Sequence, residues 1–371
     1  MLSPRHAVCV AAAVLAALVL AGCTPTPSPE PTLTPTSTPS PGPSNEPLTC
    51  DGLAPAELVG AVLTGADGVA PQPVPAVQAT TAMLALELAA AGGLNCSWRT
   101  GPVPQSEFDG SGEVAYLSVR VLPNAASQYQ PVWAGDAPST ETREVGDVTA
   151  STAFGEVGWR LAAPVGDAWV ELHLAAPGLG TVGSVFDGVN PDTVLDRLAE
   201  LAAPVFSTLA TASPGQLAWP RSESMRQGDA ICNGGLNPQG IGMALGAGVI
   251  EAEASDPTSA PPRSFHEAAA AAARSFTCDY LVDGVPGPHV TFLVGAGGLF
   301  DVLKQADLAT TFEPLDLSAI PSYAAGDEAL RAIVTDGPAS PVYLKVGNSV
   351  YEIESHDGPT AVAEAILAQI R

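Results

Sequence analysis

Apolar residues recur along this chain at two spacings, each typical of one kind of element. Between Pro55 and Gly65 they recur every three or four positions, which predicts a helix with one apolar face. Residues 115–121 and 169–174 are short runs of Val, Leu and aromatic residues, which favours strands. The chain is therefore predicted to mix helices with strands.

The first part of the chain, residues 50–212, is predicted to have two helices, two strands, a short helix, a hairpin and a last helix. Asn190 is expected to cap the last helix, with Pro191 at its first position. The other predicted elements are helices after Pro55 and at 79–91, strands at 96–99 and 115–121, a short helix capped by Asn124 that carries Tyr129, Val132 and Trp133, and a hairpin of 158–161 and 169–174 that turns at 164–167.

The second part, residues 230–371, repeats this order after a predicted linker at 213–229. Its predicted elements are helices at 238–245 and 264–275, strands at 277–282 and 289–294, a helix with Phe300 and Leu303, a hairpin of 342–346 and 350–353, and a last helix from Pro359. The repeated order predicts an α+β fold of two tandem domains, each an antiparallel sheet with helices packed on one side.

Four cysteines beyond the amino-terminal segment fall into two pairs with the same spacing of 46 residues. Equal spacing pairs Cys50 with Cys96 and Cys232 with Cys278. Disulfides between them are predicted if the chain is exported, as its amino terminus indicates below, because an exported chain meets an oxidising compartment. A zinc site and a redox pair are the alternatives. No Cys-x-x-Cys cluster or histidine at zinc spacing favours either one.

The amino terminus is typical of a lipoprotein leader, which is removed after export. Residues 7–20 form an apolar run that is too short to span a bilayer comfortably. Leu20-Ala21-Gly22-Cys23 resembles the bacterial lipobox, in which cleavage precedes the cysteine and its thiol carries diacylglycerol. We expect a signal peptide at 1–22, a lipid on Cys23 and a position on the outer face of the cell membrane. The alternative is an ordinary secretory signal with an incidental cysteine.

Residues 23–49 are rich in Pro, Ser and Thr and hold few residues that could form a core. Such a segment is predicted to be a disordered linker that lifts the folded part away from the membrane.

The charge of the chain excludes one class of partner. With 14 Lys and Arg against 39 Asp and Glu, the net charge of -25 would repel nucleic acid. The acidic residues are scattered singly or in twos, which predicts a solvated surface rather than a cation-binding site.

A family resemblance rests on a few residues of the first part. It is similar to an uncharacterised family of actinobacterial lipoproteins with the motif Cys-x-x-Leu-x-Pro and a later Cys-x-Trp, which look like relatives of the PsbP-like fold. The second part departs from this motif at an extra glycine before Leu236 and at Tyr280 in place of Trp. The matching residues are Cys50, Leu53, Pro55, Cys96 and Trp98. The resemblance implies an envelope location and a PsbP-like fold in tandem duplicate, and it implies no activity.

No local motif for catalysis or cofactor binding stands out, so we expect no cofactor and no bound metal. The glycine run at 240–246 has the wrong spacing for a dinucleotide fingerprint. The histidines are isolated in the sequence, and the tryptophans are expected in the cores, although they would be the first candidates to line any pocket. These residues are His173, His266, His289 and His356, and Trp98, Trp133, Trp159 and Trp169.

These patterns favour a non-enzymatic binding or scaffolding lipoprotein of the cell envelope. Its partner would be an envelope protein, a lipid or a small molecule, held on a sheet face or in the cleft between domains. One alternative is an envelope hydrolase whose site assembles from distant residues, for example His173 with an Asp and a Ser. Another is a substrate-binding lipoprotein of a transporter, which predicts a hinged α/β cleft.

Overall fold

The computed structural model describes residues 46–104, 111–155, 158–221, 232, 236–246, 250–306, 312–332, 341–355 and 358–370. Cys23, the predicted signal peptide, most of the predicted linker at 23–49 and His356 lie outside these residues. Contacts divide the chain into residues 1–44 and 45–371, and the second unit carries all of the described structure. Within the described residues, no helix is both long enough and apolar enough to cross a membrane.

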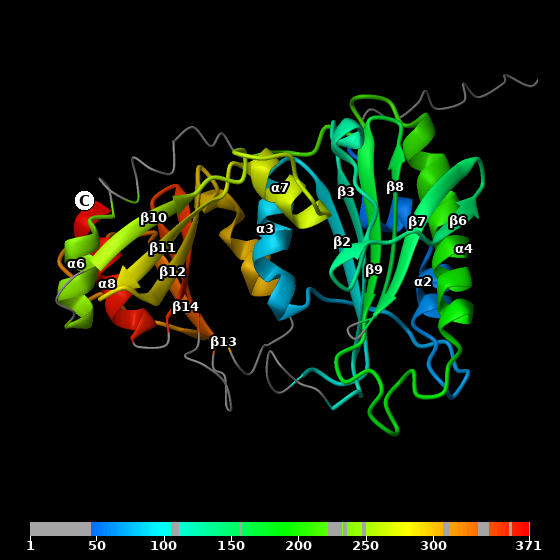
Figure 1. Cartoon of the computed structure of the whole chain (residues 1–371), viewed down its shortest axis with the longest axis horizontal. Coiled ribbons are helices and arrows are strands. Elements are labelled where there is room, and N and C mark those ends of the chain that lie inside the picture. The colour runs from blue at the N-terminus through cyan, green and yellow to red at the C-terminus, as the bar shows by residue number, and fades with distance from the viewer. Residues whose placement is uncertain are drawn as a thin grey trace, which may run out of the picture. The chain divides into compact units, whose positions relative to one another are not determined.

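The first half of this unit is built on an antiparallel sheet of seven strands, in the order β1-β2-β3-β9-β8-β7-β6 (Figure 1). The two central strands, β3 and β9, are buried at every residue. The strands are β1 Val74–Pro75, β2 Leu94–Thr100, β3 Ala115–Leu122, β6 Thr142–Val145, β7 Val148–Gly155, β8 Gly158–Val165 and β9 Ala168–Ala175.

Helices cover both faces of this sheet, so the prediction of helices on one side is wrong. Side chains alternate across a strand, and both sets of β9 are buried. Val170, Leu172 and Leu174 pack in one core with α4 (Pro191–Thr211) and α2 (Ala56–Val62). On the opposite face, Trp169 packs with Leu84 and Leu88 of α3 (Ala82–Ala90), which follows the short 3₁₀ helix η1 (Ala79–Thr81).

The second half has a sheet with the same arrangement, in the order β10-β11-β12-β16-β15-β14-β13. Each strand occupies the place of its counterpart in the first sheet, as a duplication predicts. Helices α6 (Pro238–Leu245) and α8 (Pro359–Ile370) pack on its outer face, in one core with Cys278, Val290 and Ile353. The strands are β10 Ile250–Ser255, β11 Phe276–Val282, β12 Val285–Val294, β13 Phe312–Pro314, β14 Glu328–Ala332, β15 Val342–Val346 and β16 Ser349–Glu354.

Helix α3 lies between the two sheets (Figure 1). It joins the two halves, because its side chains pack on both. Met83 and Leu86 belong to one cluster with Leu293 of β12 and Phe300 of the 3₁₀ helix η4 (Gly297–Gln305). Leu84 and Leu88 belong to another cluster with Trp169 and with Phe265 of α7 (Phe265–Ala273). A helix that is apolar all round is buried. Glu87 is the charged residue of α3, and its side chain therefore sits in the interior.

The predicted disulfides are confirmed, and each ties the start of one half to its sheet. Cys50, in helix α1 (Cys50–Leu53), is bonded to Cys96 of β2. Cys232 is bonded to Cys278 of β11. The bonded strands hold the same place in the two sheets.

Two segments differ from their predictions. The helix predicted after Asn124 is only the 3₁₀ helix η2 (Ala126–Gln128), and the chain then forms β4 (Trp133–Ala134), which pairs with β5 (Ala137–Pro138). Several strands of both sheets were not predicted. Strand β7, for instance, is rich in Ala, Ser and Thr and lacks a strong apolar alternation.

The predicted linker at 213–229 is described as far as Arg221, and this part lies against the first half. Leu48 donates its backbone N–H to the carbonyl of Gln216 at 3.0 Å. Trp219 donates its indole N–H to the carbonyl of Leu48 at 2.8 Å. These contacts anchor residues 213–221 to the first core.

Candidate functional site

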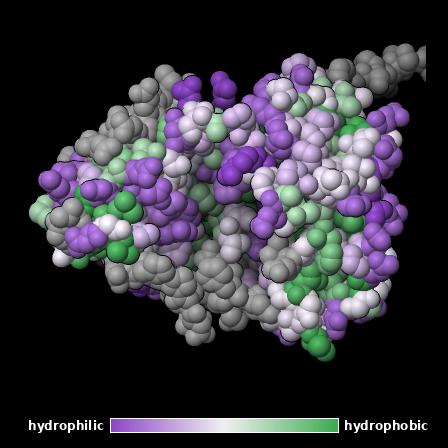
Figure 2. All heavy atoms as spheres, in the orientation of Figure 1, coloured by the Kyte–Doolittle hydropathy of each residue, from purple (hydrophilic) through white to green (hydrophobic). Residues whose placement is uncertain are grey.

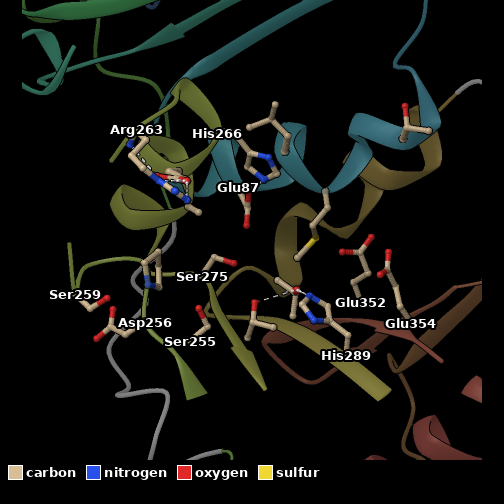
Figure 3. Close-up of a pocket in the computed structure, with 18 of the residues that line it drawn as sticks. Glu87, Ser255, Asp256, Ser259, Arg263, His266, Ser275, His289, Glu352 and Glu354 are labelled. Atoms are coloured by element: carbon tan, nitrogen blue, oxygen red, sulfur yellow. Dashed lines mark hydrogen bonds and ion pairs between the residues drawn. The ribbon is translucent and has the colours of Figure 1, made fainter. Parts of the chain in front are cut away.

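A cavity of about 860 Å³ lies where the inner face of the second sheet meets α3, α7 and the loop after β10. Figure 2 shows hydrophilic side chains gathered around the recessed surface between the two sheets, and Figure 3 shows the lining. The floor is formed by β11, β12 and β16, so residues far apart in sequence meet here. The polar lining includes Glu87, Asp256, Arg263, His266, Glu267, Ser275, Thr277, His289, Thr291, Glu352 and Glu354.

Glu87 and His266 join α3 to α7 at this cavity. The side chain of Glu87 is 3% exposed, and its Oε2 lies 3.0 Å from Nε2 of His266. This hydrogen bond raises the pKa of His266, whose own side chain is 61% exposed. A buried carboxylate needs such a partner, because an uncompensated charge in the interior is costly.

The loop of residues 256–263 forms one wall and is braced from both ends. Asp256 Oδ1 accepts the backbone N–H of Thr258 at 2.7 Å, which closes a turn. The indole N–H of Trp133, from the first half, donates to the carbonyl of Arg263 at 2.8 Å. With Pro257, this bracing gives the wall a defined position.

At the start of α7, the capping residues place the carboxylate of Glu267 beside the guanidinium of Arg263. Ser264 Oγ accepts the backbone N–H of Glu267 at 3.2 Å. The carboxylate of Glu267 accepts the backbone N–H of Arg263 at 2.7 Å and its guanidinium at 2.7 Å. Arg263 therefore lowers the pKa of Glu267, and its positive charge is largely offset by a neighbour.

A chain of polar contacts runs across the floor of the cavity. His289 Nδ1 lies 2.6 Å from Oδ1 of Asp279, which is opposite it on β11. His289 Nε2 lies 3.5 Å from Oγ1 of Thr291, which lies 3.3 Å from Oγ1 of Thr277. His289 and Thr291 share a face because they are two residues apart on a strand.

The charge of the described lining is negative. Five carboxyl groups face one guanidinium and two imidazoles, so the balance stays negative even with both imidazoles protonated. The prediction of a solvated acidic surface fits the exposed Asp256 and Glu354 but not the buried Glu87, so it describes only part of these five groups. They come from α3, α7, the loop and β16, and only the alternation of Glu352 and Glu354 with apolar residues on β16 was visible in the sequence.

The first sheet carries a different set of side chains at the corresponding strand positions. Pairing across β3 and β9 places Arg120 opposite Glu171, where pairing across β12 and β16 places Thr291 opposite Glu352. Arg120 Nη1 lies 2.9 Å from Glu171 Oε1, and both side chains are buried. The first half therefore fills this face with its own ion pair.

His173, which a hydrolase would have placed with an Asp and a Ser, belongs to this filled face. Burial lowers its pKa well below the usual value, and the nearby charges of Arg120 and Arg160 act in the same direction. Its strand partner is Ser118. The described lining of the cavity does not include His173.

The tryptophans do not line the cavity either. Trp98 and Trp159 lie in the core of the first half, and Trp169 packs under α3. Trp133 acts one step away, through its hydrogen bond to the loop. A tryptophan was a reasonable candidate from composition, but the lining that the fold assembles is polar.

The other sequence candidates are placed as follows. The glycine run at 240–246 lies in α6 and ends at Gly246, whose positive φ closes the helix. His266 and His289 line the cavity. The described residues hold no group of three or more His, Cys, Asp or Glu side chains suited to one metal ion.

Comparisons with known proteins add no relative. The chain matches no protein-family model, and no curated protein or solved structure is significantly similar to it. The functional argument therefore rests on the geometry of the site.

Proposed function

We propose that this protein is an extracytoplasmic lipoprotein, anchored by Cys23, that binds a small molecule without chemically changing it. The observation that carries this proposal is the cavity of about 860 Å³ with a polar lining drawn from both halves. Its size lies within the usual range for ligand pockets of about 300–1,000 Å³. The disulfides and the braced loop support a preformed site, which lowers the entropic cost of binding.

Anchoring is proposed from the lipobox-like residues before Cys23 and from the Pro-rich segment after them. A lipid on this thiol would hold the chain to the outer face of the cell membrane. Replacing Cys23 with Ala should move the protein from the membrane fraction to the soluble fraction. Unchanged recovery with the membranes would refute lipid anchoring.

The two halves are proposed to be copies of one PsbP-like domain. Support comes from the matching strand order of the two sheets and from disulfides at corresponding strands. The non-enzymatic role is proposed because no local motif for catalysis stands out in the sequence. Binding in the cavity would place the ligand between the second sheet and α3, which the first half supplies.

Native mass spectrometry of the full-length chain in detergent micelles tests the binding role. Ala270 lines the cavity and is half-buried on α7, so Ala270→Trp should fill the cavity and remove a co-purifying small molecule. Ala203 is exposed on α4, and Ala203→Trp is the matched control that should retain it. Equal ligand retention in both variants would contradict binding at this site.

A hydrolase remains the second candidate because Asp279, His289 and Thr291 form a chain of contacts like that of an acid, a base and a hydroxyl. Thr291 lies on β12, which pairs with a strand on each side, so the backbone groups of Thr291 bond within the sheet. Acyl transfer also requires donors for an oxyanion. Hydrolysis of short esters that is lost in His289→Gln and in Thr291→Val would favour this candidate over binding alone.

A further inference from the structure

We infer that the cavity takes a linear organic cation with two or more ammonium groups, such as an aliphatic polyamine. This inference rests on the proposed binding function and names its ligand class. The cavity's negative charge balance favours a positively charged occupant, because like charges in a shared hollow repel each other.

The carboxylates stand on separate walls, which favours an occupant with separated charges. Glu87 lies on α3, Asp256 on the loop, and Glu354 on β16 (Figure 3). A chain with ammonium groups at intervals can place one near each carboxylate.

The rest of the lining suits the methylene groups between the charges. Ala79, Met83 and Leu84 from α3 and its preceding turn offer an apolar strip, and Tyr343 adds an aromatic ring. Hydroxyl groups of Ser275, Thr277 and Thr291 can accept hydrogen bonds from ammonium groups. Long amines bury their stems along apolar surface while the charged groups keep polar partners.

In the first half, the chain itself supplies a cation at the corresponding face of the sheet. At the place of Thr291 it has Arg120, whose guanidinium lies beside Glu171. Thr291 is much shorter and lines the cavity. We expect a ligand ammonium group to occupy the space that corresponds to the Arg120 guanidinium.

Isothermal titration of spermidine into the full-length chain in a non-ionic detergent tests the inference. We expect saturable binding of one molecule, weakened by added salt. Thr291→Arg should lower the affinity at least about 100-fold, because it supplies the internal cation and fills the space. Thr291→Val removes one accepting hydroxyl but adds no charge, so it should weaken binding far less than Thr291→Arg, by about fivefold.

Single carboxylate variants add a graded test. Glu354→Gln should weaken spermidine binding about tenfold. Glu200 is exposed on α4, and Glu200→Gln removes the same charge and should have no measurable effect. Equal weakening by both variants, or binding unchanged by Thr291→Arg, would mean diffuse attraction to an acidic chain and would overturn the inference.

Two probes of similar length separate this inference from the proposed function. 1,8-Octanediol has no charge and suberate has two negative charges. If either binds more tightly than spermidine and Ala270→Trp abolishes that binding, the cavity is a binding site but the cation inference is wrong. If no probe binds and Ala270→Trp leaves native mass spectra unchanged, both proposals fail.

Discussion

The polar faces of the two sheets occupy the same strand positions but have opposite characters. In the first half, Arg120 and Glu171 form a buried ion pair and His173 is sealed beside them. In the second half, Thr291, Glu352 and Glu354 line a cavity. The same topology thus supports a filled face and an open one. The difference lies in a few side chains, chiefly a long guanidinium replaced by a short hydroxyl.

This contrast shows that one strand order can accommodate two different polar faces. The polar side chains of the first sheet contact one another. The first half also contributes α3 and Trp133, which contact the second half. The second half leaves room for an occupant. Four predictions would break or sharpen the comparison, and they follow from the largest expected effect to the smallest.

Removing the guanidinium from the filled face should have the largest effect on stability. Arg120→Met leaves the Glu171 carboxylate buried without its partner, which should lower the free energy of unfolding by about 3–5 kcal/mol. Urea unfolding of the full-length chain measures the loss. Thr291→Val, at the corresponding place of the second half, should cost less than about 1 kcal/mol. Similar losses of unfolding free energy at positions 120 and 291 would contradict the conclusion that the first sheet's polar face is filled and the second sheet's is open.

The disulfides should contribute equally to the two halves. Each closes a loop with a sequence separation of 46, and restricting the unfolded chain in this way stabilises by about 2–4 kcal/mol. The double variants Cys50→Ser/Cys96→Ser and Cys232→Ser/Cys278→Ser should therefore lose similar unfolding free energy in urea. A loss confined to one variant would show that the halves differ in more than their polar faces.

Two histidines should give opposite pH dependence. The pKa of His173 is lowered by burial, so its folded form resists protonation and stability falls as the pH drops below about 6.5. The pKa of His266 is raised by Glu87, so its contribution is complete below about 6.5 and is lost as the pH rises through the raised pKa.

Unfolding free energies between pH 5 and pH 8 in urea check these signs. His173→Asn should flatten the acid loss by at most about 1.4 kcal/mol per pH unit. His266→Gln should steepen the acid loss, because it removes a group that stabilises the protein at low pH. If both variants shift the profile in the same direction, His173 is not held neutral by burial.

The smallest expected effect concerns the wall of the open face. Trp133→Phe removes the indole hydrogen bond to the carbonyl of Arg263, which should cost about 1 kcal/mol. Amide exchange of residues 256–263 should become faster, while exchange in β3 and β9 should not change. Equal exchange in the loop of the variant and the parent chain would show that Trp133 does not brace it.

Predictions from local pattern were accurate where neighbouring residues decide the structure. Asn190 caps α4 and Pro191 starts it, because capping depends on a few adjacent groups. The hairpin of β8 and β9 and the last helix, α8, were also found. Strands such as β7 and β14 were missed, because they carry a weaker apolar pattern.

By itself, the sequence determined the order of the main helices and strands, the two disulfides and the mixture of helix with antiparallel sheet. These follow from residue spacing and from capping and pairing between neighbours. Only the tertiary structure decided that helices cover both faces of the sheets, that α3 serves both halves, and that carboxylates from four segments share one cavity. The reason is physical: a side chain's face is set by local geometry, but what covers that face depends on segments far away in the chain.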